Sequence, residues 1–148
     1  MKWTTKQLAL CAVLAALALG LSTLESLFPI SLLIPLPGVK LGLANIVTVF
    51  ALYELGALPA LAILITRCVL GGLFAGNVSA MLFSLLGGLL AMAVMIALRH
   101  CRRLSIYGVS IGGAAAHNIG QMAAAVITLG STMVLGYLPF LLAVSLFT

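Results

Sequence analysis

Long apolar stretches fill most of the chain, and short breaks rich in charged residues, proline or glycine separate them. Residues 8–24 and 79–98 contain no charged side chain, and residues 104–148 contain none apart from any charge on His117. About 20 apolar residues cross the core of a bilayer as an α-helix. The pattern therefore predicts six membrane-spanning helices, near residues 7–27, 41–56, 58–75, 79–98, 104–128 and 134–148.

The composition supports an all-α fold, an integral membrane bundle formed by residues 1–148 as a single transmembrane domain. Hydrophobic residues make up 64% of the chain and charged residues 6%, whereas a soluble domain carries about 25% charged residues. A surface of this kind must face lipid. We expect no separate soluble domain and no nucleic-acid partner, because the net charge of +5 mostly reflects basic residues between the spans.

The positions of the basic residues predict the orientation of the bundle. Lys2 and Lys6 precede the first span, and residues 99–103 hold one histidine and three arginines between the fourth and fifth spans. Because cytoplasmic loops are enriched in Lys and Arg, both places should be cytoplasmic. We expect a multi-pass protein of the cell membrane with its N- and C-termini in the cytoplasm, and a retained first helix rather than a cleaved signal peptide.

Two breaks in the pattern are unusual. Pro29, Pro35 and Pro37 interrupt the chain between the first two spans although the residues between them stay apolar. Since proline forbids a regular helix there, the segment is interpreted either as a lid on the outer face or as a loop that dips into the headgroups. The last span, with Pro139 in its first turn, is short and ends at Thr148 without a basic residue, which is compatible with a longer natural chain.

Polar side chains within the spans indicate a pocket. Arg67 lies midway along the third span and His117 midway along the fifth. A charged residue at the centre of the bilayer costs about 2.5–3.5 kcal/mol on insertion scales, so Arg67 should face the interior. The other polar residues expected around this pocket are Asn45, Thr48, Asn118 and Gln121.

Lys40 and Glu25 are expected to rim the pocket at its outer mouth. Together with Arg67, Lys40 makes the pocket electropositive unless Glu25 neutralises one of the two cations, which favours a small ligand bearing a carboxylate or phosphate. The alternative is a structural ion pair of Arg67 with Glu25 or Glu54 and no ligand. His117 is expected to be a hydrogen-bonded packing residue rather than a proton relay.

Small residues repeat at every fourth position in two spans. Gly108, Gly112, Ala116, Gly120 and Ala124 form such a stripe in the fifth span, which predicts close packing inside the bundle. Ala12, Ala16 and Gly20 form another in the first span. A terminal helix is accessible to an outside protein, so this second stripe serves either helix packing or partner docking.

Several chemistries have no support in the sequence. The chain has no glycine-rich loop ending in Lys and Ser or Thr, the signature of a P-loop. Glu25 and Glu54 are the only acidic residues, and a magnesium–diphosphate site needs several carboxylates. The three cysteines have neither paired nor metal-ligand spacing. These features argue against stand-alone prenyl-diphosphate synthesis and ATP hydrolysis, and we expect no catalytic residue, no metal and no cofactor.

Two motifs carry a family resemblance. Residues 37–47 read PGVKLGLANIV and open the second span, and residues 108–110, GVS, lead into AHNIGQ at residues 116–121. With SLLGGL at residues 84–89 and Arg67, the chain resembles the bacterial Gx transporter family, also called heptaprenyl diphosphate synthase component I. The resemblance covers nearly the whole chain.

The resemblance implies a fold and partners. The family is similar to the substrate-binding S components of energy-coupling factor transporters, which are six-helix proteins of the bacterial inner membrane. It implies that Ala12, Ala16 and Gly20 dock on a transmembrane coupling subunit and that separate ATPases supply the energy. The substrate would be a small molecule that is anionic or isoprenoid-like.

Three functions follow as hypotheses. The first is the substrate-binding membrane subunit of a small-molecule uptake transporter. The second is a membrane component of a heptaprenyl diphosphate synthase, in isoprenoid or quinone biosynthesis, as the second family name implies. The third is a scaffold protein in which the polar residues only join helices; it predicts that replacing Arg67 impairs folding without a separable loss of binding.

Overall fold

The computed structural model describes residues 4–27, 42–101, 104–130 and 132–144. The proline-containing segment interpreted as a lid, with Lys40, lies outside these ranges. The described residues are helical or in short turns. The helices are α1 (Thr5–Leu27), α2 (Asn45–Glu54), α3 (Ala57–Ala75), α4 (Val78–Arg99), α5 (Ile106–Leu129), the 3₁₀ helix η2 (Thr132–Tyr137) and α6 (Leu138–Val144).

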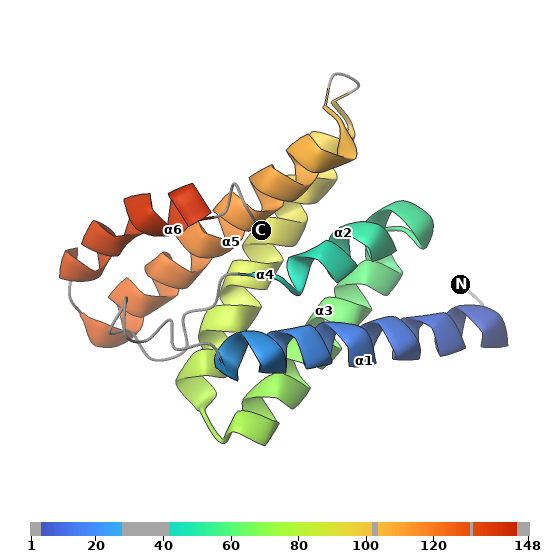
Figure 1. Ribbon diagram of the computed structural model, residues 1–148, viewed down its shortest axis with the longest axis horizontal. Helices are drawn as coiled ribbons and strands as arrows, with labels where there is room; N and C mark the ends of the chain where they lie inside the picture. Colours follow the sequence, from blue (N-terminus) through green and yellow to red (C-terminus); the bar gives the residue numbers. More distant parts are fainter. Residues whose placement is uncertain (1–3, 28–41, 102–103, 131, 145–148) are drawn as a thin grey trace.

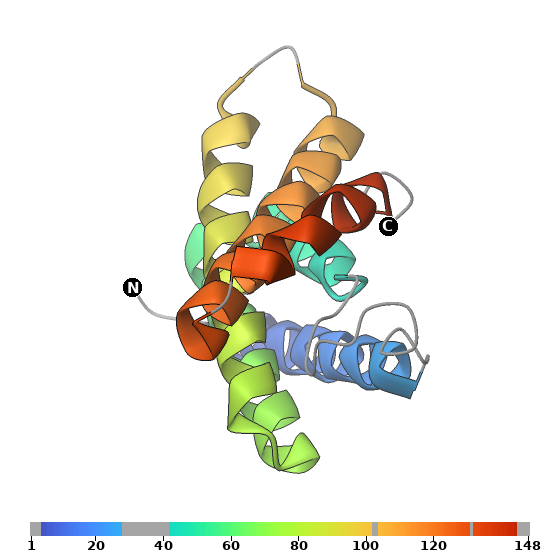
Figure 2. The same ribbon diagram turned by 90° about the vertical axis from the view of Figure 1, so that its left-hand side faces the viewer.

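The helices form a bundle in which α4 is central. It pairs with α5 along most of its length and with α3 on another side, and α1 lies across α3. The short α2 packs against α3, α1 and α5, while η2 and α6 fold back along α5. Figure 2 shows α4 and α5 side by side.

Glycines on the facing sides of α4 and α5 allow the two backbones to approach closely. A Cβ atom added to Gly120 would lie 2.7 Å from the Cα atom of Gly87, and one added to Gly87 would lie 2.8 Å from the carbonyl oxygen of His117. The neighbouring Gly88 faces α3 instead, with Leu64 Cδ1 2.8 Å from the added atom. The two adjacent glycines of α4 therefore allow close packing against two different helices. At Gly120, the small-residue stripe of the fifth span packs inside the bundle, as predicted.

Residues at the helix ends have side chains or conformations that terminate the helices. Asn77 caps the N-terminus of α4, where its Oδ1 accepts a hydrogen bond from the backbone N–H of Ala80 at 3.0 Å, and Ser105 caps α5 through the N–H of Gly108 at 3.3 Å. Gly76 ends α3 with φ +60°, a conformation that glycine adopts without the steric cost of a Cβ atom. These local signals separate α3, α4 and α5 at the positions that the charge and glycine pattern predicted.

Two apolar clusters fill the interior of the described part. The larger joins α1, α2, α3 and α4 with the start of α5, around Leu14, Leu52 and Ile63. The smaller joins α4, α5 and α6 around Phe83, Met122 and Leu141. The polar residues of the candidate site belong to neither cluster.

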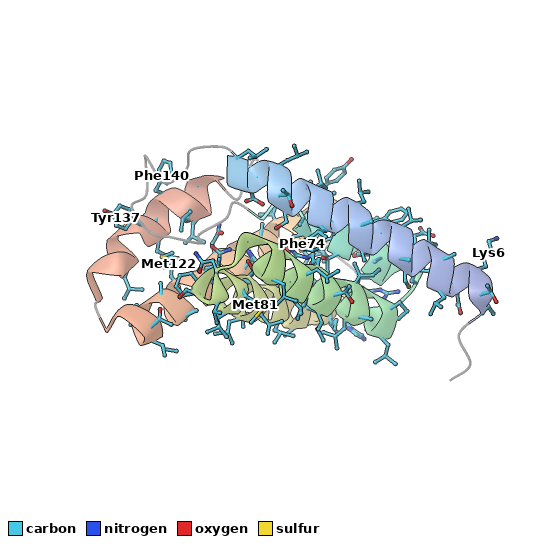
Figure 3. All side chains as sticks on the ribbon, turned by 90° about the horizontal axis from the view of Figure 1, so that it is seen from below. Lys6, Phe74, Met81, Met122, Tyr137 and Phe140 are labelled. Atoms are coloured by element: carbon cyan, nitrogen blue, oxygen red, sulfur yellow. The ribbon has the colours of Figure 1, made fainter. Side chains whose placement is uncertain are left out.

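The outer surface is apolar, as expected for a protein in lipid. Large hydrophobic side chains point outward from several helices; Leu27 is 74% exposed, Phe74 76% and Ile127 79%. Figure 3 shows side chains projecting around the bundle, including Phe74 on α3. Three helices of the described residues, α1 over Thr5–Glu25, α3 and α4, are long and apolar enough to cross a bilayer. The structure thus supports a membrane protein.

The predicted spans differ from the observed helices in three places. The second span was predicted over residues 41–56, but α2 has 10 residues and at 1.5 Å per residue covers about 15 Å, half of a bilayer core of about 30 Å. The last span contains the 3₁₀ turns of η2 followed by 7 residues of α6. α5 has 24 residues, but it is not one of the described helices that are long and apolar enough to cross a bilayer.

The C-terminal ends of α2 and α4 are held together by Arg99. Its Nη1 donates a hydrogen bond to the carbonyl oxygen of Leu52 at 2.8 Å, and its guanidinium lies 5.2 Å from the ring centroid of Tyr53. The last carbonyls of a helix have no partner within that helix, so Arg99 supplies one for α2. The two ends therefore lie side by side, as the predicted topology requires.

We expect Arg99→Met to lower the free energy of unfolding by about 1–2 kcal/mol, because it removes a charged hydrogen bond and a cation–π contact. Thermal unfolding of the detergent-purified chain measures this loss. Lys6→Met, which removes one positive charge from an exposed position of α1, is the control and should change stability by less than about 0.5 kcal/mol. Equal effects of the two substitutions would contradict the role given to Arg99.

Candidate functional site

Arg67 is buried in the middle of α3 and contacts the first residue of α2. Its side chain is 4% exposed, and its Nη2 donates a hydrogen bond to Oδ1 of Asn45 at 3.1 Å. Asn45 is itself 3% exposed. The arginine therefore faces the bundle interior, as its energetic cost in lipid predicts.

The turn that precedes α2 connects this pair to α1. Gly42 has φ +94°, and its carbonyl oxygen accepts a hydrogen bond from the backbone N–H of Asn45 at 2.8 Å. The N–H of Gly42 donates to Oε1 of Glu25, near the end of α1, at 2.6 Å. Glu25 was expected at the rim, but it is 2% exposed. Two interactions offset the cost of burying this carboxylate. One is the hydrogen bond from the Gly42 N–H, and the other is the electrostatic interaction of Glu25 with Arg67.

α5 contributes His117 and Gln121 to the same region. Their side chains lie one turn apart on one face of the helix, with His117 Nε2 2.6 Å from Gln121 Nε2. The amide donates to the ring nitrogen when that nitrogen is unprotonated. A Cβ atom added to Gly42 would lie 3.3 Å from His117 Cδ2 and 3.2 Å from Asn45 Nδ2. His117 and Asn45 therefore both lie close to this glycine.

The other candidate residues lie elsewhere. Asn118, next to His117 on α5, points to α6, where its Nδ2 donates to the carbonyl oxygen of Leu141 at 2.8 Å. Thr48 is buried, and its hydroxyl donates within α2 to the carbonyl oxygen of Ala44 at 3.4 Å. Glu54 is exposed at the end of α2 opposite to Asn45, so the alternative pairing of Arg67 with Glu54 is wrong.

Two buried donors of the site have no hydrogen-bond partner among the described residues. They are Nε of Arg67 and Nδ2 of Asn45. Buried polar groups are nearly always hydrogen-bonded, and leaving one unsatisfied costs about 1–3 kcal/mol. Both groups carry hydrogen, so each lacks an atom that accepts a hydrogen bond.

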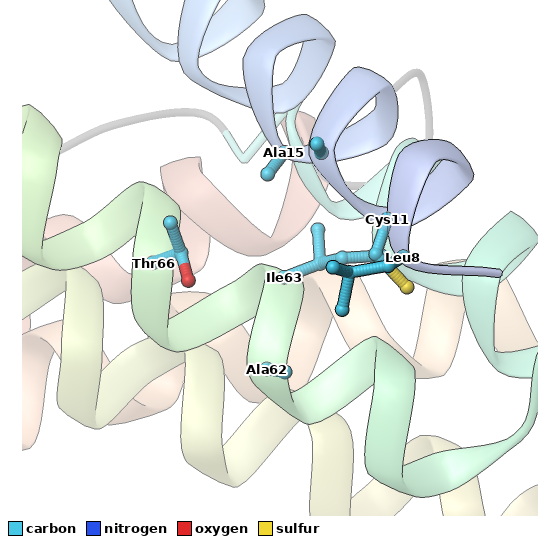
Figure 4. A pocket seen from close by; sticks show the side chains of 7 residues that line it. Leu8, Cys11, Ala15, Ala62, Ile63 and Thr66 are labelled. Carbon is cyan, nitrogen blue, oxygen red and sulfur yellow. The ribbon is translucent and has the colours of Figure 1, made fainter. Parts of the chain in front are cut away.

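A separate apolar cavity lies between α1 and α3. It has a volume of about 470 Å³ and is lined by side chains of the two helices, Leu8, Cys11, Ala12, Ala15, Ala62, Ile63 and Thr66. Figure 4 shows these residues from close by, with those of α1 facing those of α3. Ala12, Ala16 and Gly20, the stripe expected to dock a partner, are all exposed. They are therefore available to another protein or to lipid.

Two glycines were not among the predicted site residues. Gly42 binds Glu25 through its backbone, and Gly87 lies against His117. Gly42 belongs to the PGVKLGLAN motif and Gly87 to SLLGGL, so each was marked by its motif. Both contacts involve backbone atoms, which every residue type has. The residue types alone therefore could not predict these two contacts.

Comparisons with known proteins agree with the motifs. Neither the curated proteins nor the solved structures contain a match to the chain. A family model described as heptaprenyl diphosphate synthase component I matches residues 14–148. That range includes the Arg67–Asn45 pair and both motif regions. The chain therefore belongs to the heptaprenyl diphosphate synthase component I family.

Proposed function

We propose that the chain is the substrate-binding membrane subunit of a small-molecule uptake transporter. The site lies where the end of α1, the start of α2, and the middles of α3 and α5 meet. Arg67 and Asn45 would bind the substrate, with His117 and Gln121 beside them. Separate coupling and ATPase subunits would supply the energy, since the sequence has no P-loop.

The pair of unsatisfied donors, Arg67 Nε and Asn45 Nδ2, carries this proposal. If Arg67 and Asn45 only joined helices, we would expect all of their hydrogen-bonding groups to have partners within the protein, because lipid provides no hydrogen-bond partners. Arg67 instead uses Nη2 on Asn45 and keeps Nε for another acceptor. A ligand with acceptor oxygens would supply the partners that these two donors lack.

Native mass spectrometry of the detergent-purified chain tests the proposal. The wild-type protein should retain a small molecule that is lost in Asn45→Leu, which removes one donor of the site. Leu86→Ala is the control, since Leu86 is exposed on α4, and it should retain the molecule. A wild-type chain purified from its natural membrane without any bound molecule would contradict the proposal.

The exposed stripe of α1 is the surface that would dock on the coupling subunit. Ala16→Leu should leave folding and ligand retention unchanged, because Ala16 is exposed, and should reduce complex formation by ten-fold or more, about 1.4 kcal/mol. Co-purification with the coupling subunit of the same organism measures this effect. Ala93→Leu, on the exposed face of α4, is the matched control. Equal complex formation by both variants would exclude the stripe as the docking surface.

The family description favours a second function, a membrane component of a heptaprenyl diphosphate synthase. In that case the chain would support a separate aspartate-rich catalytic subunit. Addition of the purified chain to that subunit should then restore chain elongation. An unchanged elongation rate with an active partner would exclude this function.

A further inference from the structure

Glu25 and Arg67 are the buried charged side chains in the part of the protein that the structure describes. Their formal charges cancel. A chain of contacts joins them: Glu25 Oε1 accepts from Gly42 N–H at 2.6 Å, the Gly42 carbonyl oxygen accepts from Asn45 N–H at 2.8 Å, and Asn45 Oδ1 accepts from Arg67 Nη2 at 3.1 Å. The two charges also interact electrostatically. In the described part of the protein, Glu25 is therefore the acidic group linked to the arginine.

The hydrogen-bonding groups of Arg67 and Asn45 that still lack a partner among the described residues are donors. Arg67 Nε and Asn45 Nδ2 each present an N–H group without a partner. A ligand that fits them needs an oxygen with free lone pairs, and it needs no negative charge to balance the arginine. A phosphate or diphosphate would instead place extra negative charge near the carboxylate of Glu25, in surroundings where repulsion is weakly screened.

We propose that the Arg67 site binds an uncharged ligand through a carbonyl or amide oxygen and discriminates against phosphate and diphosphate groups. This inference rests on the proposed function, because it names the substrate class of the same site. An uncharged ligand differs from the anionic ligand expected from the sequence. That expectation depended on Glu25 not neutralising the positive charge of Arg67. An isoprenoid-like tail stays compatible with it, provided that the head group is uncharged.

Titration with inorganic pyrophosphate tests the charge balance directly. The full-length chain in detergent is compared with Glu25→Gln and with the double variant Glu25→Gln/Arg67→Met, and thermal unfolding is the readout. Glutamine keeps an oxygen that can accept from Gly42 N–H but removes the negative charge. Pyrophosphate should stabilise Glu25→Gln by several degrees, and should change the wild type and the double variant equally little.

Two results would overturn the inference. One is stabilisation of the wild type by pyrophosphate as large as that of Glu25→Gln and larger than that of the double variant. The other is a lack of stabilisation of Glu25→Gln, since an unbalanced Arg67 should attract the anion. If Glu25→Gln does not fold, the molecule that co-purifies with the wild type decides: an uncharged compound supports the inference, and a carboxylate or phosphate compound overturns it. An anionic co-purifying molecule would still support a substrate-binding role, so the two proposals fail separately.

Discussion

Arg67→Met is expected to abolish ligand retention and to destabilise the chain by about 3–5 kcal/mol. The substitution leaves Glu25 buried without its positive partner, and the loss of one member of a buried ion pair has a cost of this size. It also removes the Nε donor and the hydrogen bond from Nη2 to Asn45 Oδ1. Thermal unfolding in detergent measures stability, and native mass spectrometry measures the bound molecule.

The double variant Arg67→Met/Glu25→Gln separates the two effects. Removing both charges leaves a neutral pair, so much of the lost stability should return, whereas ligand retention should not. A purely structural role of Arg67 predicts instead that stability and ligand retention recover together. That outcome would remove Arg67 from the residues that bind the ligand.

Gly120→Ala is expected to have the second large effect, a destabilisation of about 1–3 kcal/mol or more. The added Cβ atom would lie 2.7 Å from Gly87 Cα and 3.1 Å from the carbonyl oxygen of Leu86. Both are backbone atoms of α4, so no side chain can rotate away and the two helices must separate. Insertion of an extra carbon into well-packed regions usually costs this much.

Gly20→Ala is the matched control, because a Cβ atom added to Gly20 in α1 has no neighbour within 4 Å. Alanine at such a helical position should leave the protein unchanged or stabilise it by about 0.5–1 kcal/mol. Thermal unfolding of both variants under one condition compares them. A Gly120→Ala variant as stable as wild type would show that α4 and α5 do not pack as closely as described.

The sequence predicts the helical class well because the signals are strong and local. Apolar runs place α1, α3 and α4 within a few residues. In the structure, Asn77 and Ser105 cap the starts of α4 and α5. The length of α2 was not predictable in this way. Its N-terminal boundary depends on a turn at Gly42 that Glu25 stabilises from 17 residues away, and hydropathy carries no trace of this contact.

Two features of the candidate site could be predicted from the sequence. Burial of Arg67 follows from the cost of a cation in lipid, and the pairing of His117 with Gln121 follows from their spacing of one helical turn. Asn118 was predicted in the same cluster, but its amide nitrogen donates to Leu141 of α6, since successive residues of a helix project about 100° apart. The burial of Glu25 needed the tertiary arrangement of α1 and α2.

The backbone N–H of Gly42 fixes the end of α1 to the entrance of α2, directly beside the groups proposed to bind the ligand. A molecule that draws charge or hydrogen bonds away from Glu25 therefore also changes the free energy that holds α1 in place. Since α1 carries the stripe proposed to dock the coupling subunit, occupancy of the interior and attachment of that subunit would be linked equilibria. Such a linkage is reciprocal: whatever the ligand does to subunit affinity, the subunit does to ligand affinity by the same factor.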